Sequence, residues 1–120
     1  MSTSAAQSAE FYVEALREGR VWGIKDGAGF PAPKNADGVR AMPFWSLQSR
    51  AERIIETVSA YTGFEPVEIS LADWRSRWLP DLAVKGAHIG LNWSGTRATG
   101  YDIEPDAVER NLAAHESSGT

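Results

Sequence analysis

Glycine and proline residues divide this chain into short segments, and the apolar residues of those segments repeat with two different periods. In residues 4–18 and 47–58 they recur every three or four positions, which is the period of a helix with one buried face. In residues 88–93 larger apolar residues alternate with small or polar ones, which is the period of a strand. Because each period suits only one conformation, the chain must combine helices with strands. The pattern predicts an α+β fold.

The N-terminal strands are expected to form a β-meander. The first covers residues 21–26 and the third covers residues 39–45. Between them, residues 30–33 can form only an edge or irregular strand, because Pro31 and Pro33 have no N–H to donate to a ladder. Turn-forming residues separate the three segments, so each strand would pair with the one before it.

The rest of the chain alternates helices with strands, so that about four helices pack on a mixed β-sheet. Ser46 or Ser49 is the candidate cap of the second helix, and Ser70 is that of the third. Pro80 is expected to stop or kink the third helix. Pro105 stands in the first turn of the last helix. The further strands are expected at residues 66–69, 88–93 and 99–103.

The length of the chain, 120 residues, suits one domain and leaves little room for two. Residues 8–113 hold the pattern of helices and strands and are expected to form this α+β domain. Residues 1–7 would be a flexible N-terminus or the start of the first helix. The last residues of the chain are small and polar, so residues 114–120 are expected to be a disordered tail.

The composition argues against several classes of function. The chain has no cysteine, so it has no disulfide framework and no thiolate nucleophile, and it suits a reducing compartment. Its net charge of −4 at pH 7 gains little from a phosphate backbone, so no nucleic-acid partner is expected. It has neither a signal-peptide pattern nor an apolar run near the ~20 residues that span a bilayer. We therefore expect a cytoplasmic protein with no membrane partner.

No metal, cofactor or catalytic group stands out in the sequence. His88 and His115 lie on different predicted elements, and neither has a second ligand at metal-binding spacing. Gly23, Gly27 and Gly29 belong to a strand and a turn and do not open a helix, so they do not form a phosphate loop. The nucleophile motif Gly-x-Ser-x-Gly is missing as well. We predict no metal, no cofactor and no catalytic residue.

The five tryptophans are the most unusual feature of the composition. Trp74 and Trp78 share a face of the third helix, and Trp93 alternates with apolar residues, so these three are expected in the core. Trp22 and Trp45 are followed by polar residues, and the sequence leaves open whether they lie in the core or at the surface.

A surface position for Trp22 and Trp45 would create a binding site. Trp45 and Ser46 would then lie at the end of the sheet beside a helix N-terminus, a place that suits a peptide or an anion. His88 would be the only ready general base in such a site. The candidate binding residues are Trp22, Lys25, Trp45, Ser46, Arg50 and His88.

Several stretches carry a resemblance to a known family. They are VWGIKDGAGFPAP, MPFWS ahead of a helix with Ala51, EISLADWRSRWLPDLAVKG, HIGLNW and residues 100–105. In this order they resemble a bacterial family known as domain of unknown function 2750, over residues 8–112. The family has no established activity and so implies no catalytic residues. A weaker, architectural likeness to the SseB-type N-terminal domain implies a protein-interaction module more than an enzyme.

These observations favour a small bacterial protein that binds a protein partner without catalysis, either as an adaptor or as an immunity-type inhibitor of a toxin. The alternative is a small-ligand-binding protein, or an enzyme whose site the sequence does not reveal. The chain is expected to be a monomer or a weak homodimer. Prolines in residues 30–33 argue against pairing of that edge with a second copy.

Overall fold

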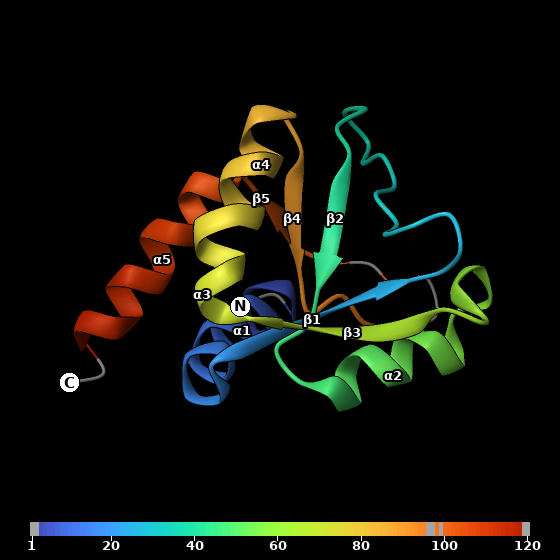
Figure 1. Cartoon of the computed structure of the whole chain (residues 1–120), viewed down its shortest axis with the longest axis horizontal. Helices are drawn as coiled ribbons and strands as arrows, with labels where there is room; N and C mark the ends of the chain where they lie inside the picture. Colours follow the sequence, from blue (N-terminus) through green and yellow to red (C-terminus); the bar gives the residue numbers. More distant parts are fainter. Residues whose placement is uncertain (1–2, 96–97, 99, 119–120) are drawn as a thin grey trace.

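Helices pack against two small β-sheets in this protein, and the edge of the sheet at β2 faces a loop (Figure 1). The structure is a computed structural model and describes residues 3–95, 98 and 100–118; within the first helix, side chains are described from Ser8 onward. The elements are α1 (Thr3–Glu18), β1 (Arg20–Lys25), β2 (Ala41–Phe44), α2 (Gln48–Thr57), a 3₁₀ turn (Ser59–Tyr61), β3 (Glu65–Ser70), α3 (Leu71–Asp73), a π-helical segment (Trp74–Trp78), α4 (Leu79–Val84), β4 (His88–Leu91), β5 (Asp102–Ile103) and α5 (Pro105–Ser118). This arrangement confirms the predicted α+β class.

The strands form one antiparallel pair and one mixed sheet. β1 pairs with β3, from Arg20 opposite Ser70 to Lys25 opposite Glu65. In the other sheet β4 lies in the middle, parallel to β2 and antiparallel to β5. In the part of the chain that the structure describes, one isolated bridge joins the two sheets: the N–H groups of Trp22 and Trp45 each donate to the other residue's carbonyl, at 2.7 and 2.8 Å.

The predicted β-meander is wrong in its pairing. β1 takes β3 as its ladder partner, and β2 takes β4, so neither pairs with its neighbour in sequence along a ladder. Residues 26–40 form a long loop between β1 and β2, in which Asp26 and Lys34 take part in isolated β-bridges (Figure 1). Pro31 and Pro33 cannot donate backbone hydrogen bonds, which explains why residues 30–33 form no strand.

The third helix runs from Leu71 through Pro80, so of the two effects expected of Pro80, a stop or a kink, the stop is wrong. Its predicted cap is present, because the Ser70 hydroxyl accepts a hydrogen bond of 3.1 Å from the Asp73 N–H. The helix widens to a π-helix over Trp74–Trp78, and the Leu79 N–H donates to the Trp74 carbonyl. Pro80 lacks an N–H and its ring displaces the carbonyl one turn earlier, so the wider turn is its expected consequence.

The C-terminal segment that was predicted to be disordered is helical as far as Ser118. Tertiary contacts hold it. The His115 ring packs on the Tyr12 ring with centroids 5.1 Å apart, and Arg75 pairs with Glu116 at 3.0 Å. The small polar residues of this segment suggested disorder because the residues that hold it in place lie far away in the sequence. Residues 119–120 lie outside the described part of the chain.

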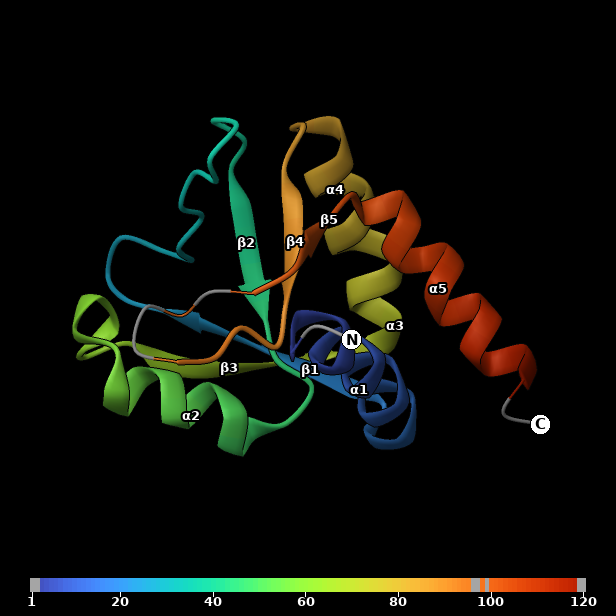
Figure 2. The ribbon, with the colours of Figure 1, turned by 180° about the vertical axis from the view of Figure 1, so that it is seen from behind.

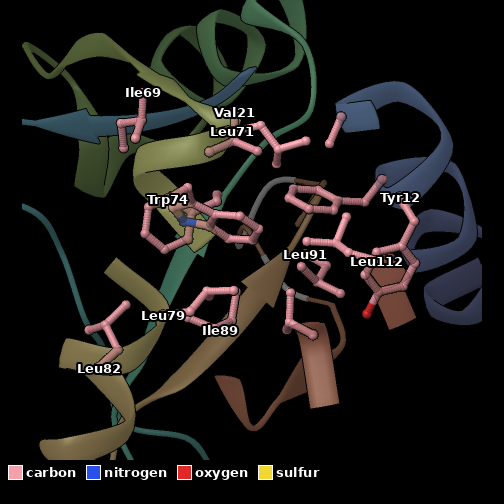
Figure 3. Close-up of a cluster of buried hydrophobic side chains, with 14 residues drawn as sticks. Tyr12, Val21, Ile69, Leu71, Trp74, Leu79, Leu82, Ile89, Leu91 and Leu112 are labelled. Atoms are coloured by element: carbon pink, nitrogen blue, oxygen red, sulfur yellow. The ribbon is translucent and has the colours of Figure 1, made fainter. Parts of the chain in front are cut away.

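Two clusters of buried side chains form the core. The larger lies among α1, the helix of residues 71–84, α5 and both sheets, with Trp74 inside it (Figure 3). The rings of Phe11 and Phe44 pack on Trp74, with centroids 5.5 and 5.3 Å from its own. The smaller cluster contains Trp45, Ile54 and Trp93. Trp74 and Trp93 are buried as predicted, whereas Trp78 is half-buried at the edge of the larger cluster.

Candidate functional site

The parallel strands β2 and β4 end at the same edge of their sheet, where they lie side by side in both views (Figures 1 and 2). Ser46 lies two residues after the end of β2, and Asn92 directly follows β4. Ligands of sheets with parallel strands commonly bind outside the carboxyl ends of the strands. This carboxyl edge is therefore the first place to look for a site.

Hydrogen bonds between Ser46 and Asn92 join the two strand ends. The Ser46 N–H donates to Asn92 Oδ1 at 3.0 Å, and Asn92 Nδ2 donates to the Ser46 hydroxyl at 3.0 Å. The side chains are 0% and 2% exposed. Asn92 has a φ of 52°, and asparagine is one of the few residues that adopt this left-handed conformation readily.

A partly buried carboxylate, that of Glu14, completes this network. The Ser46 hydroxyl donates to Glu14 at 2.6 Å, so it does not cap α2 as predicted. The cap position is Leu47, which makes no side-chain cap bond, and so Ser49 does not cap the helix either. Burial acts to raise the pKa of Glu14, but hydrogen bonds from Arg50 and Ser46 outweigh it and hold this pKa below its ordinary value.

Arg50 joins α2 to α1 through two carboxylates. Its Nε and one terminal nitrogen donate to the two oxygens of Glu14, each at 3.0 Å. The same terminal nitrogen donates to Glu10 at 2.8 Å. This fork-like geometry is the strong form of the arginine–carboxylate pair. The charge of Arg50 is therefore compensated within the protein.

A groove of about 720 Å³ lies beside this network, between α2 and residues 92–95. Its apolar members include Ile54 and Trp93, and its polar members include two arginines, Arg50 and Arg53. Arg53 is exposed, and no carboxylate of the described residues pairs with it. The lining residues are Leu47, Ser49, Arg50, Arg53, Ile54, Thr57, Asn92, Trp93, Ser94 and Gly95.

Trp93 is held rigidly at the groove. Its indole N–H donates to the Tyr101 carbonyl at 3.1 Å, and its own carbonyl accepts the indole N–H of Trp45 at 2.9 Å. The ring lies directly over Gly90, because a Cβ at that position would be 2.4 Å from the Trp93 ring. Glycine at position 90 therefore makes room for the indole.

The predicted binding residues lie in three different places. Of the six, only Arg50 lines the groove. Trp45 and Ser46 are buried directly behind it, and Trp22 is half-buried against the same small cluster. Lys25 is exposed at the end of β1. A binding role for Trp22, Lys25, Trp45, Ser46, Arg50 and His88 stays a prediction.

His88 lies at the amino end of β4, at the opposite end of the strand from Asn92. Its Nδ1 is 3.2 Å from Asp102, and the Asn35 side chain donates to the same carboxylate oxygen at 3.0 Å. These contacts join the loop of residues 26–40 to β4 and β5. His88 also lines a small cavity of about 200 Å³ with Glu104 and Asp106, and the residues that line it include no serine, threonine or cysteine nucleophile.

Four residues important at the carboxyl edge were not identified from the sequence: Glu14, Arg53 and Asn92, and Trp93 as a residue that lines the groove. Asn92 is a polar residue near the end of the predicted strand of residues 88–93, and this was the available signal. This signal could be used only together with the parallel pairing of β2 with β4, which the predicted β-meander did not include.

Two searches of the described residues were negative. They contain no group of three or more histidine, cysteine, aspartate or glutamate side chains placed to hold a metal ion. Among the described helices, none is both long and apolar enough to cross a membrane.

Comparison with known proteins places the chain in a family but not in a functional class. No curated protein and no solved structure matches it. The likeness to the SseB-type domain stays a prediction. A family model described as "Protein of unknown function (DUF2750)" matches residues 8–112, which is most of the chain. The chain therefore belongs to the DUF2750 family of proteins of unknown function.

Proposed function

We propose that this protein is a non-enzymatic interaction module that binds an extended segment of a partner protein in the groove beside α2. The observation that carries the proposal is the groove itself, which has an apolar part at Ile54 and Trp93 and a polar rim with two arginines. Grooves of this composition, apolar with a few placed polar groups, are typical binding sites.

The length of the groove favours an extended segment. Its lining residues on the α2 side run from Leu47 to Thr57, which corresponds to about 15 Å along the helix axis. An extended chain rises about 3.3 Å per residue, so four or five residues match this length. Trp93 is 8% exposed and forms part of the groove floor, where hydrogen bonds at its indole N–H and its carbonyl hold it in place. Tryptophan is one of the residues that dominate binding energy at interfaces.

The polar groups behind the groove favour binding over catalysis. The Ser46 hydroxyl is buried and donates to Glu14, whose pKa is lowered despite its burial. Such a carboxylate serves as a hydrogen-bond acceptor and not as a proton carrier near neutral pH. Adaptor and immunity-type inhibitor are the two roles we propose for such a module, as a monomer or weak homodimer in a bacterial cytoplasm.

A second candidate function is the binding of a small molecule. It is favoured by the groove volume of about 720 Å³, which falls within the ~300–1,000 Å³ of small-ligand sites. A thermal-shift screen of small carboxylic acids tests it, since a ligand that binds only the folded state raises the melting temperature.

Selection from a random heptapeptide display library tests the interaction module. The baits are the wild-type protein and two tryptophan variants of neighbouring exposed residues of α2. Ser49→Trp fills the groove, whereas Gln48→Trp adds the same side chain at a residue that does not line it. We expect enriched peptides that bind wild type and Gln48→Trp equally and bind Ser49→Trp at least tenfold more weakly. Enrichment of no peptide, or of peptides that ignore Ser49→Trp, would contradict the proposal.

A further inference from the structure

We infer that the segment bound in the groove is acidic, and that Arg53 is the residue that recognises its charge. This inference rests on the proposed function and adds the chemistry of the partner. It is carried by the different surroundings of the two groove arginines.

Arg50 and Arg53 both line the groove, but only one has its charge compensated. Arg50 binds the two oxygens of Glu14 through Nε and Nη2, which form one edge of its guanidinium, and Nη2 also pairs with Glu10. Burial of Glu14 and the 2.8 Å contact with Glu10 leave Arg50 as a structural link between two helices. It is therefore unsuited to exchange these partners for a ligand.

Arg53 is three residues further along the same helix, so it lies close to the same face. It is exposed, and the described residues offer it no carboxylate partner. The acidic residues nearest to it on α2, Glu52 and Glu56, do not line the groove. Among the described residues that line the groove, Arg53 is thus the cation without an ion-pair partner, in a protein of net charge −4.

This geometry indicates the chemistry of the bound segment. A carboxylate of the bound segment meets the Arg53 guanidinium, whose planar fork matches a carboxylate. An apolar side chain beside it packs on Trp93 and Ile54. A segment of four or five residues that contains aspartate or glutamate next to a large apolar residue satisfies both contacts. Complementary charge at the rim supplies specificity and faster association.

A double-mutant cycle tests the contact directly. The probes are a terminally blocked heptapeptide of the most enriched display sequence and the same peptide with its acidic residue replaced by glutamine. They are titrated against wild type, Arg53→Gln and Arg110→Gln. Arg110 is an exposed arginine of α5 outside the groove, so its variant controls for the change in net charge.

At low ionic strength we expect Arg53→Gln to weaken the acidic peptide about fivefold and Arg110→Gln to weaken it less than twofold. The glutamine peptide should bind wild type about fivefold more weakly, but should bind Arg53→Gln no more weakly than the acidic peptide does. The Arg53→Lys variant should retain part of the preference.

Two outcomes would overturn the inference and leave the proposed function standing. One is the enrichment of groove-dependent peptides without acidic residues. The other is an equal loss for the glutamine peptide in wild type and in Arg53→Gln, which would mean that the carboxylate does not contact Arg53. If no peptide depends on the groove at all, the proposed function fails together with the inference.

Discussion

Replacement of Gly90 by alanine should disturb the groove from within the sheet. A Cβ at this position would lie 2.4, 2.5 and 2.7 Å from Cε2, Cζ2 and Nε1 of Trp93. Ordinary contacts of a Cβ are at 3.4 Å or more, so the indole must move by about 1 Å. The movement breaks its hydrogen bond of 3.1 Å to the Tyr101 carbonyl.

The expected cost comes from two effects. Loss of the indole hydrogen bond costs about 0.5–1.5 kcal/mol, and overpacking of a closely packed site costs about 1–3 kcal/mol. We therefore expect Gly90→Ala to lower the free energy of unfolding by about 1.5–4.5 kcal/mol. Urea denaturation followed by tryptophan fluorescence measures this change.

A matched control and a rescue variant make the test specific. Gly27→Ala introduces the same Cβ where no atom lies within 4 Å, so its effect should stay below about 1 kcal/mol. Trp93→Phe removes the part of the ring that clashes, so the double variant Gly90→Ala/Trp93→Phe should cost less than the sum of the two single changes. A free energy of unfolding for Gly90→Ala within about 0.5 kcal/mol of wild type, or strict additivity, would refute the reasoning.

Three further predictions concern side chains that hold the fold together. Trp45→Phe should lower the free energy of unfolding, measured by urea denaturation, by about 1–3 kcal/mol more than Trp74→Phe does. Of these two residues, Trp45 donates its indole N–H to a buried group, the Trp93 carbonyl, whereas the Trp74 N–H has no partner among the described residues. Equal losses would contradict this assignment. Glu14 has a lowered pKa in the folded state, so its contribution to stability is present above its ordinary pKa of about 4.5 and is lost as the pH falls through the folded value. The difference in the free energy of unfolding between wild type and Glu14→Gln should therefore be largest near pH 7 and shrink below about pH 4; a difference independent of pH would contradict it. Arg75→Gln should speed amide hydrogen exchange in the last turns of α5, because Arg75 pairs with Glu116 there and with Glu109 earlier in the same helix. Unchanged exchange would show that these ion pairs do not hold the helix end.

Local signals predicted the elements of this fold well. The helical period of residues 4–18 corresponds to α1, and the serine cap at Ser70 is present with the expected hydrogen bond. These features depend on residues within one turn of each other, so the sequence alone contains the physical cause.

Pairing between distant strands was not predictable from the same signals. β2 pairs with β4, which follows it by more than forty residues, and alternation within a strand does not identify its partner. The alternation of residues 88–93 predicted a strand but not its place in a sheet. β4 is the central strand of its sheet, and Gly90, one of the small residues of the alternation, is buried beneath the indole of Trp93.

The candidate site was only partly predictable for the same reason. Ser46 and Arg50 were singled out because polar residues follow a tryptophan, and both belong to the network at the carboxyl edge. Their partners Glu14 and Asn92 come from α1 and from the end of β4, so only the tertiary fold brings the four together. Arg53 could not be distinguished from Arg50 until the carboxylate partners of each were known.

The central claim is that a peptide segment binds against Trp93 in the groove beside α2. The most direct test is a two-dimensional ¹H–¹⁵N spectrum of the five tryptophan indole N–H groups during titration with the enriched heptapeptide. Our account predicts that the Trp93 resonance shifts in a saturable way, while that of Trp74, in the larger cluster, stays in place. A peptide that binds without moving the Trp93 resonance would contradict the account.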